Sequence, residues 1–206
     1  MSEKLVHLVD DDEAIRRSAS FLLKTSGYLV KSYASGAELL KEREIAPGCI
    51  LLDVRMPEMD GLQVQHELCG RGIGLPVVVM TGHGDVNVAV QAMKAGAVDF
   101  IEKPFEKAAL LSAIEEGFAR IRQASRQGQR ADEARVRLQA LTPREHDVLE
   151  GLVRGHPNKT IAYDLDISPR TVEIHRANLM SKLGVASLSE ALRIAFAAGL
   201  GDDRPA

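Results

Sequence analysis

A short apolar run that stops at an acidic residue constrains this 206-residue chain more than any other feature. Residues 49–52 are apolar, the run ends at Asp53, and Pro57 and Gly61 follow within eight residues. Apolar residues bounded by turn-forming residues indicate a strand that is buried on both faces of a parallel sheet. Such a strand presents Asp53 at its carboxyl end, which is the edge where ligands bind in open α/β sheets. Asp53 is therefore the candidate reacting group.

Similar apolar runs recur along residues 1–121, and segments with helical spacing separate them. This alternation predicts an α/β fold with a five-stranded, doubly wound parallel sheet and helices on both faces. The predicted strands are residues 4–9, 28–33, 49–52, 76–81 and 98–105. The predicted helix caps are Asp12, Ser35, Asp60 and Asp85, and a further helix is predicted to begin near Glu106.

The apolar pattern fails beyond this first domain, from residue 122 to 135, where Gly128 also disfavours a helix. We predict a linker over residues 122–138, and the sequence leaves open whether it extends the preceding helix or forms a flexible tether. Residues 139–206 contain four segments with helical spacing and no strand, which predicts a small all-α domain. Its helices are predicted at residues 141–155, 158–165, 169–183 and 187–198, with Leu188, Ala191, Leu192 and Phe196 buried in the last.

Charge is distributed unevenly over these parts of the chain. Residues 1–118 carry 12 Lys and Arg against 18 Asp and Glu, whereas residues 135–206 carry ten against nine. An acidic first part and a nearly neutral last part suggest domains with different partners. No apolar run reaches the ~18 residues of a membrane span, and the N-terminus lacks the layout of a signal peptide. We therefore expect a cytoplasmic protein with no membrane partner.

Five polar residues lie at the ends of predicted strands, on one edge of the sheet. Asp10 and Asp11 follow the first strand, Asp53 the third, Thr81 ends the fourth and Lys103 lies at the end of the fifth. Crowded carboxylates protonate or bind a cation, and all-oxygen ligands suit Mg²⁺ better than Zn²⁺. A carboxylate beside a metal, a lysine and a hydroxyl can accept a phosphoryl group, because this transfer needs mainly positioning and charge neutralisation. The edge therefore predicts a magnesium-dependent phosphoacceptor site.

The stretches VDDDE, LLDVRMPEMDG, MTGHGD and IEKPF occur in this order, and residues 1–121 resemble the receiver domain of two-component response regulators. The resemblance implies a CheY/flavodoxin-like fold with Asp53 as phosphoacceptor. It implies that the Mg²⁺ ligands are Asp10, Asp11, Asp53 and the backbone carbonyl of Arg55. It further implies that Thr81 and Lys103 hold the phosphoryl oxygens and that Phe100 is an aromatic switch. Arg55 and His83 are expected to flank the hydrolytic water.

A short helix, a three-residue turn and a longer helix at residues 158–183 form the arrangement of a helix-turn-helix. In the longer helix, Val172, Leu179 and Leu183 have core-facing spacing, which leaves an outer face with a local charge of +2. Such a face suits phosphate contacts and base reading in double-stranded DNA. The candidate DNA contacts are Asn158, Lys159, Arg170, Thr171, Glu173, Ile174, His175, Arg176, Ala177, Asn178 and Lys182.

The stretch LTPREHDVLEGLVRGHPNKTIAYDLDISPRTVEIHRANLMSKL resembles the LuxR-type DNA-binding domain. The resemblance implies that the DNA backbone is contacted by Lys159, Thr171 and His175. The positions implied to read bases are Glu173, Ile174 and Ala177. A basic residue is common in that family at the place of Glu173, and an acid there would favour cytosine and disfavour nearby phosphate.

Together the two domains resemble response regulators of the FixJ type, which control nitrogen-fixation and low-oxygen respiration genes. The resemblance implies a FixL-like sensor histidine kinase as phosphoryl donor, and we also expect RNA polymerase as a partner. We expect a transcription activator and not an enzyme, which forms a homodimer on phosphorylation through a face that includes Val90, Lys94 and Ile101. The alternatives are an Mg²⁺-dependent aspartyl-phosphate phosphatase and a constitutive DNA-binding protein with a non-signalling receiver. Arg55 lies where such a phosphatase needs a second acid, and the complete set of pocket residues disfavours a non-signalling receiver.

Overall fold

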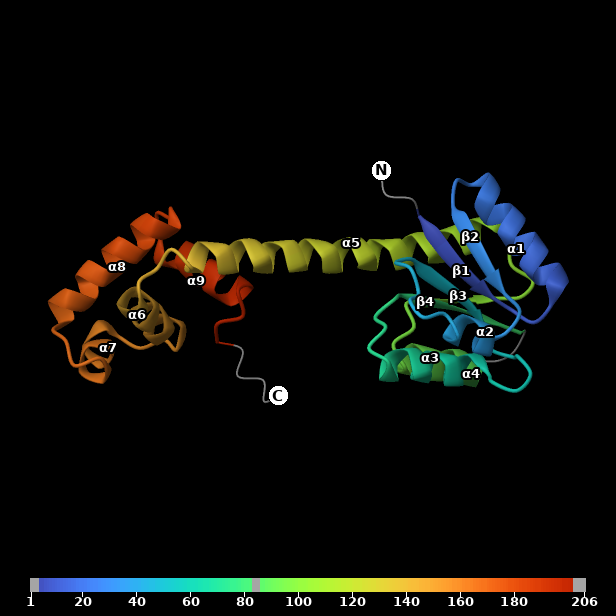
Figure 1. The fold of residues 1–206 in the computed structure, drawn as a ribbon, viewed down its shortest axis with the longest axis horizontal. Helices are drawn as coiled ribbons and strands as arrows, with labels where there is room; N and C mark the ends of the chain where they lie inside the picture. The colour runs from blue at the N-terminus through green and yellow to red at the C-terminus, as the bar shows by residue number, and fades with distance from the viewer. Residues whose placement is uncertain (1–3, 83–85, 202–206) are drawn as a thin grey trace. The chain divides into compact units, whose positions relative to one another are not determined.

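The computed structural model describes residues 4–82 and 86–201, and the chain divides into two compact units, residues 1–123 and 124–206. The first unit contains a five-stranded sheet in the order β2-β1-β3-β4-β5, in which every pair is parallel (Figure 1). The strands are β1 (Leu5–Val9), β2 (Leu29–Tyr33), β3 (Cys49–Asp53), β4 (Val77–Thr81) and β5 (Asp99–Glu102). The helices are α1 (Glu13–Thr25), α2 (Gly36–Leu40), α3 (Gly61–Gly70), α4 (Val86–Lys94) and α5 (Lys107–Leu138), which begins in this unit. The predicted doubly wound α/β fold is confirmed.

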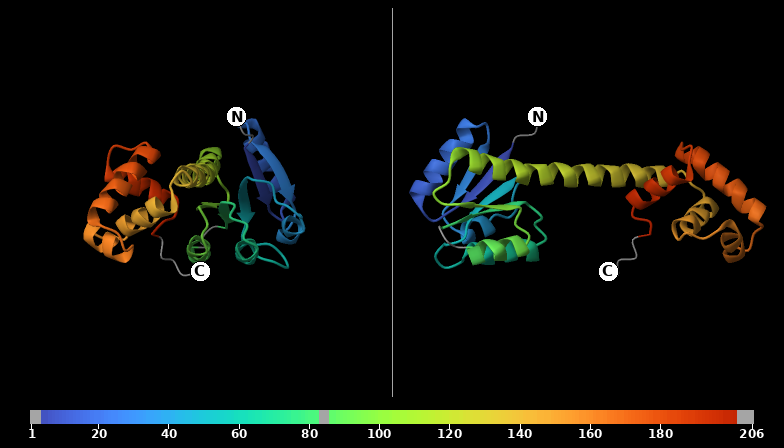
Figure 2. Two further views of the ribbon diagram at one scale, coloured as in Figure 1. Left: turned by 60° about the vertical axis from the view of Figure 1, so that its left-hand side comes forward. Right: turned by 180° about the vertical axis from the view of Figure 1, so that it is seen from behind.

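Two hydrophobic cores lie on opposite faces of this sheet. One face is covered by α1 and the first part of α5, and the other by α2, α3 and α4 (Figures 1 and 2). The first core contains Leu51 with Leu23 of α1 and Ile114 of α5, and the second contains Leu52 with Leu68 of α3. Leu51 and Leu52 are neighbours in β3, and they enter different cores because successive side chains of a strand point to opposite faces. This is why the strand is apolar throughout.

The strand register places the predicted site residues at one edge of the sheet. Asp53 pairs with Met80 of β4, and Thr81, the next residue of β4, pairs with Glu102 of β5. Asp10 directly follows β1, which lies beside β3. Because all the strands are parallel, their carboxyl ends lie along the same edge of the sheet.

Side-chain caps start the helices of the first unit where the sequence predicts them. Asp12 accepts hydrogen bonds from the first turn of α1, Ser35 caps α2 and Asp60 caps α3. These caps satisfy backbone N–H groups that have no partner inside the helix. The predicted cap Asp85, and His83 with its expected role beside the phosphoryl group, lie outside the described residues.

The helix α5 is continuous over 32 residues, so residues 122–138 are helical. This answers the question that the sequence left open about the secondary structure of this segment. The boundary between the two units falls inside the helix. Near its start α5 lies very close to β3, because a Cβ atom at Gly117 would be 2.6 Å from the Sγ atom of Cys49. Among the helices that the structure describes, α5 included, none has the length and apolar character needed to cross a membrane.

The second unit is built from helices around one core. They are α6 (Pro143–Val153), α7 (Asn158–Asp164), α8 (Pro169–Leu183) and α9 (Leu188–Ala197). The core contains Leu149 of α6, Ile161 of α7 and Leu179 of α8, and Leu138 from the end of α5 joins it. The unit therefore takes residues from the chain before position 139. The helix α6 starts with a capping box between Thr142 and Glu145, and α8 starts at the cap Ser168.

The prediction for the buried face of α9 was wrong at one residue. Phe196 is 54% exposed, whereas Ala191 and Ala195 are fully buried. These two alanines are four residues apart and define the face that packs on the core, and Phe196 lies about 100° around the helix from Ala195. Leu188 and Leu192 are partly buried and pack against the same core.

Candidate functional site

Three carboxylates meet at the carboxyl edge of the sheet. Asp10 and Asp53 are buried and Asp11 is exposed, and one oxygen of each lies within 4.8 Å of the others. Thr81, which is 3% exposed, ends the strand next to that of Asp53. The structure therefore brings the ends of β1, β3 and β4 together, and the acids and the hydroxyl-bearing residue lie at the edge where the sequence predicted them.

Lys103 bridges the two buried carboxylates. Its Nζ atom donates a hydrogen bond to Asp10 Oδ2 at 2.6 Å and lies 2.9 Å from Asp53 Oδ1. Its backbone N–H donates to the carbonyl of Thr81 at 2.7 Å, which ties the loop after β5 to the end of β4. Burial alone would lower the pKa of Lys103, but the hydrogen bonds with both carboxylates raise that pKa overall. Lys103 is therefore held in the pocket as a cation.

Asp53 is in an environment that resists ionisation. Burial raises the pKa of its carboxyl, and the nearby carboxylate of Asp10 raises it further. Hydrogen bonds from Lys103 and from the backbone N–H of Arg55 lower the pKa without cancelling these effects. A buried carboxylate with a raised pKa that lies beside a cation is typical of a reacting group.

Arg16 holds the loop that carries the acids. Its Nη1 atom donates to the carbonyl of Asp10 at 2.7 Å and to that of Asp11 at 2.8 Å. The carboxylate of Asp10 also accepts from the backbone N–H of Asp12 at 2.9 Å. These hydrogen bonds hold the backbone of the loop that carries Asp10 and Asp11. Sequence reasoning missed Arg16, although a long donor in the first turns of the helix after an acidic loop is a usable signal.

Gly61 supports the site from the other side. Its N–H donates to the carbonyl of Val54 at 2.9 Å, which folds the loop after β3 back onto the strand. A Cβ atom at Gly61 would lie 2.4 Å from the carbonyl oxygen of Asp53. Only glycine allows α3 to start this close to the candidate reacting group.

The donor set fits Mg²⁺. When ionised, the carboxylates of Asp10, Asp11 and Asp53 with the ammonium of Lys103 carry a formal charge of −2, which one divalent cation would neutralise. The donors are all oxygen atoms, as Mg²⁺ requires, and no His or Cys belongs to this described cluster. The backbone carbonyl of Arg55 remains an expected further ligand.

An apolar groove lies beside Thr81, between α4 and β5. It has a volume of about 510 Å³. The residues that line it are Thr81, Ala89, Val90, Met93, Lys94, Phe100 and Glu102. Phe100, the predicted aromatic switch, lines this groove and is 46% exposed.

The prediction that Ile101 belongs to the dimer face was wrong, since Ile101 is 5% exposed and packs in the core between the sheet and α5. Adjacent strand residues point to opposite faces, and Phe100 takes the groove side.

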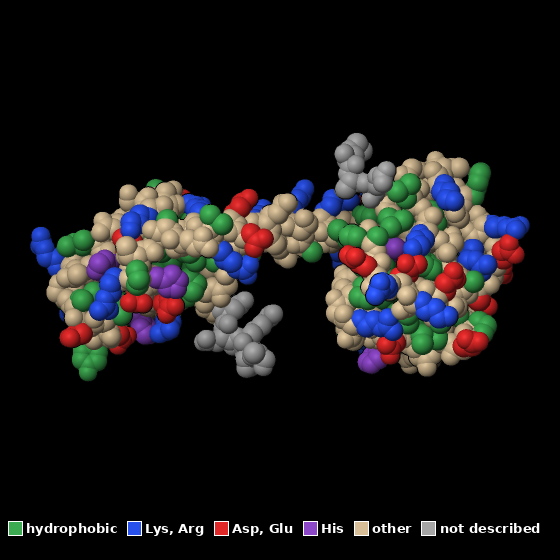
Figure 3. Space-filling model, in the orientation of Figure 1, with side chains coloured by type: hydrophobic (Ala, Val, Ile, Leu, Met, Phe, Trp, Pro, Cys, Tyr) green, Lys and Arg blue, Asp and Glu red, His purple; other side chains and the backbone are tan. Residues whose placement is uncertain are grey.

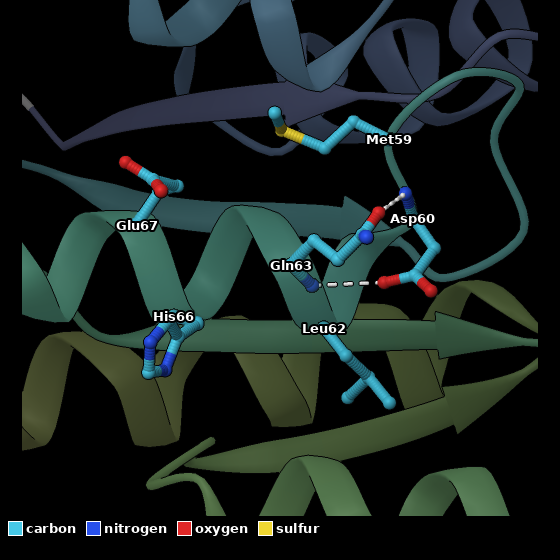
Figure 4. A pocket seen from close by; sticks show the side chains of 6 residues that line it. All are labelled: Met59, Asp60, Leu62, Gln63, His66 and Glu67. Atoms are coloured by element: carbon cyan, nitrogen blue, oxygen red, sulfur yellow. Dashed lines mark hydrogen bonds between the residues drawn. The ribbon is translucent and has the colours of Figure 1, made fainter.

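Another hollow, of about 460 Å³, lies along α3. Figure 4 shows its lining and the capping box at its end, in which Gln63 N–H donates to Asp60 and the Asp60 N–H donates to Gln63. Leu62 and His66, one helical turn apart, lie on the same side of the helix in this view. Asp60 is thus occupied as a cap, as predicted, and takes no part in the acid pocket.

The helix-turn-helix of the second unit is formed by α7 and α8. Val172, Leu179 and Leu183 are buried, as predicted. The predicted DNA contacts at the solvent-exposed surface are Lys159, Arg170, Glu173, Ile174, Ala177, Asn178 and Lys182, and Asn158, Thr171, His175 and Arg176 are half-buried. Thr171 donates its N–H to the cap Ser168 at 3.1 Å. Two of the cations, Arg176 and Lys182, have partners inside the unit, which sequence spacing did not indicate.

Comparisons with known proteins agree with both halves of this description. Residues 6–115 match the response regulator receiver domain, and residues 139–195 match the luxR family of bacterial regulatory proteins. The transcriptional regulatory protein FixJ of Azorhizobium caulinodans is 50% identical over 202 residues, which cover 97% of this chain and 96% of that protein. FixJ of Rhizobium meliloti is 47% identical over 202 residues, 98% of this chain and 99% of that protein. The crystal structure of full-length FixJ from B. japonicum has 42% identity and a TM-score of 0.61, covering 97% of this chain and 98% of that one.

A parallel α/β unit with this acid pocket, joined to a helix-turn-helix unit, defines a DNA-binding transcription regulator whose receiver responds to a histidine kinase. The chain belongs to the response-regulator family of two-component systems and is similar to the FixJ proteins over nearly its full length. Its partners are accordingly a histidine kinase and DNA. The family consists of transcriptional regulators, so the alternative of a phosphatase enzyme is set aside.

Proposed function

We propose that Asp53 accepts a phosphoryl group from the phosphohistidine of the kinase and that this switches the protein to a DNA-binding dimer that activates transcription. The observation that supports the proposal most directly is the position of Lys103, whose ammonium lies against both Asp10 and the buried carboxylate of Asp53. A cation at this place pairs with negative oxygens on a group attached to Asp53, and pairs with the carboxylates before transfer.

In the proposed transfer, a carboxylate oxygen of Asp53 attacks phosphorus, and the P–O bond forms as the P–N bond to the imidazole breaks. Lys103 offsets the charge on the transferring oxygens, which is what a loose transition state requires. Bound Mg²⁺ would supply further charge neutralisation at the same oxygens. The residues that would hold Mg²⁺ are Asp10, Asp11, Asp53 and the backbone carbonyl of Arg55.

The groove between α4 and β5 connects this chemistry to a surface. Thr81 and Phe100 both line this groove. We propose that the Thr81 hydroxyl moves to bond the phosphoryl oxygens and that the Phe100 ring turns into the space that Thr81 leaves. This motion reshapes a surface whose apolar members Val90, Met93 and Phe100 are each at least 40% exposed.

We propose that this surface, with Lys94, forms the homodimer of the phosphorylated protein. Exposed apolar side chains around a groove are typical of protein interfaces. A two-fold dimer would place two recognition helices about 34 Å apart, which suits successive major grooves of DNA. Before phosphorylation, we propose that the receiver keeps the helix-turn-helix unit from binding DNA.

The similarity to FixJ proteins supports finer proposals about the biological role. We propose that the donor is a FixL-like sensor kinase, that the target genes serve nitrogen fixation and microaerobic growth, and that the dimer contacts RNA polymerase. We also propose a cytoplasmic location, because both Cys49 and Cys69 are unpaired thiols, as is usual in a reducing compartment.

The test is sedimentation of the full chain with and without acetyl phosphate and Mg²⁺, together with mass measurement of the phosphoryl adduct. We expect a donor-dependent dimer in the native protein and in Asp132→Asn, an exposed control. Asp53→Asn should stay monomeric without an adduct, and Val90→Glu should carry the adduct but stay monomeric. Phe21→Glu, at an apolar residue of α1 that is 68% exposed against 46% for Val90, should still dimerise. A native protein that carries the adduct and remains a monomer would contradict the proposed dimer.

A further inference from the structure

The recognition helix α8 uses most of its positive charge inside its own domain. It carries three cations, Arg170, Arg176 and Lys182, and its buried face is formed by Val172, Leu179 and Leu183. By helical spacing Arg170 lies opposite that face, Arg176 lies one turn after Val172 on the same side, and Lys182 lies at the border of that face. The three cations differ in whether they have a partner within the second unit, and this difference indicates which of them are available to contact DNA.

Arg176 is tied to the other helix of the helix-turn-helix. Its Nη1 atom donates to Oδ1 of Asn158, the first residue of α7, at 2.7 Å. Both side chains are half-buried, and they connect residues 18 positions apart. The bond links the start of α7 to the middle of α8, so it restrains the angle between these two helices.

Lys182 is bonded to α6, the first of the four short helices in this unit. Its Nζ atom donates to Oε2 of Glu145 at 2.7 Å, and the Glu145 side chain is 4% exposed. The same carboxylate accepts from the N–H of Thr142 at 2.8 Å, in the capping box that starts α6. Burial alone would raise the pKa of Glu145, but the bonds from Lys182 and Thr142 lower that pKa overall. Glu145 is therefore a buried anion that needs the Lys182 cation, and together they join α6 to the last turn of α8.

Arg170 is different. Among the residues that the structure describes, it has no ion pair or side-chain hydrogen bond, and the same is true of Lys159 on α7. The exposed carboxylate of Glu173, three residues along α8, offsets the charge of Arg170. In the view of Figure 3, basic, acidic and histidine side chains are interspersed over this unit instead of forming one basic patch.

We infer that Arg176 and Lys182 are positioning residues that orient the recognition helix, and that the phosphate contacts of the helix-turn-helix come from Arg170 on α8 and Lys159 on α7. The inference rests on the proposed function, because it assigns roles within the DNA-binding surface. A cation already bonded within the domain would lose that bond on pairing with a phosphate, so it contributes little to counterion release. An unpaired cation has no such loss.

The salt dependence of DNA binding separates the two roles. Each phosphate contact contributes about −0.9 to the slope of log Kobs against log[salt]. We would titrate the full-length protein, treated with acetyl phosphate and Mg²⁺, against a duplex of randomised sequence at several salt concentrations. Arg170→Gln should reduce the slope by about 0.9 per recognition helix. Arg193→Gln, at an exposed cation of α9, is the control for net charge and should leave the slope unchanged.

For Arg176 we expect a parallel shift. Arg176→Gln should weaken binding by the same factor at every salt concentration, with the slope of the native protein. Asn158→Ala removes no charge and should produce the same shift, and the double variant should be no worse than either single one. If Arg176→Gln lowered the slope as Arg170→Gln does, while Asn158→Ala had no effect, Arg176 would be a phosphate contact and the inference would be wrong.

The positioning role of Lys182 can also be tested without DNA, by thermal unfolding of the protein. Lys182→Met should lower the Tm, since it leaves Glu145 buried without its cation. The double variant Glu145→Gln/Lys182→Met should recover part of the loss and bind DNA with the native slope. A Lys182→Met protein with the native Tm and a reduced slope would overturn the assignment. A native protein that binds no duplex under any of these conditions would instead count against the proposed function itself.

Discussion

The ammonium group of Lys103 lies 2.9 Å from the carboxylate of Asp53, although the two residues are 50 positions apart in the chain. The pair forms because β3 and β5 flank β4 and all three strands end at one edge of the sheet. The cation lowers the pKa of a carboxylate that burial raises, so Lys103 controls how much of Asp53 is ionised at a given pH.

Replacing Lys103 should therefore move the pH dependence of phosphorylation. In Lys103→Met the pKa of Asp53 rises further, because burial and Asp10 act without the opposing cation. In a plot of the rate of phosphorylation by acetyl phosphate against pH, the fall in rate on the acid side, the acid limb, should shift to higher pH. At neutral pH the rate should be lower by about tenfold or more. Lys107→Met, at an exposed position of α5, is the matched control. An unshifted acid limb in Lys103→Met would show that Lys103 does not set the ionisation of Asp53.

Arg16 should influence Mg²⁺ binding without contacting the ion. It donates to the carbonyls of Asp10 and Asp11, and loss of these bonds releases the loop from which both carboxylates project. We expect Arg16→Gln to weaken Mg²⁺ binding about tenfold, ~1.4 kcal/mol, in isothermal titration calorimetry. Arg17→Gln provides the control, since Arg17 lies on the exposed surface of α1 beside Glu13. Equal affinities in the two variants would contradict a role for Arg16 in holding the loop.

His7 should make the first unit less stable in mild acid. It is 1% exposed, its Nε2 bonds the Ala46 carbonyl at 2.9 Å and its Nδ1 lies 3.1 Å from the Tyr33 hydroxyl. A carbonyl only accepts, so Nε2 carries the hydrogen and Nδ1 accepts from Tyr33 in a neutral ring. Burial lowers the pKa of His7, and the Ala46 bond opposes this only in part.

The sign of the effect follows from proton uptake. Below the ordinary histidine pKa of about 6.5, the unfolded chain binds a proton that the folded chain does not, so the free energy of unfolding falls as pH falls. The slope contributed by His7 should approach ~1.4 kcal/mol per pH unit until the folded pKa is reached. Urea denaturation on both sides of pH ~6.5 measures it. His7→Gln should remove this slope and His66→Gln, at an exposed position of α3, should keep it; a slope that persists in His7→Gln would have another source.

Gly61 should tolerate no side chain. A Cβ atom there would meet the Asp53 carbonyl oxygen at 2.4 Å, and the obstacle is backbone that cannot rotate away. We expect Gly61→Ala to lower the free energy of unfolding by ~1–3 kcal/mol and to slow phosphorylation of Asp53, because the strand end must shift. Gly74→Ala is the control, since nothing lies within 4 Å of a Cβ atom there. Native stability and phosphorylation rate in Gly61→Ala would mean that the loop after β3 adjusts freely.

The local signals in the sequence were reliable where one short segment carries the whole cause. The helix α8 begins at Pro169, after the cap Ser168, and ends at Leu183, as the sequence predicted. The apolar run before Asp53 likewise predicted a strand buried on both faces. Such signals depend on backbone hydrogen bonding and on side-chain alternation within a few residues, so they can be read without knowing the fold.

The sequence by itself determined the parallel α/β order, the acids and the lysine at the strand ends, and the helix-turn-helix. Only the tertiary structure decided that Arg16 holds the acidic loop, that Ile101 faces the core, and that Lys182 has a partner inside the domain. The physical reason is that periodicity and spacing indicate which face of an element a residue occupies. Whether a side chain on that face meets solvent, an anion or another helix depends on segments far away in the chain, such as the one that carries Glu145, 37 positions before Lys182.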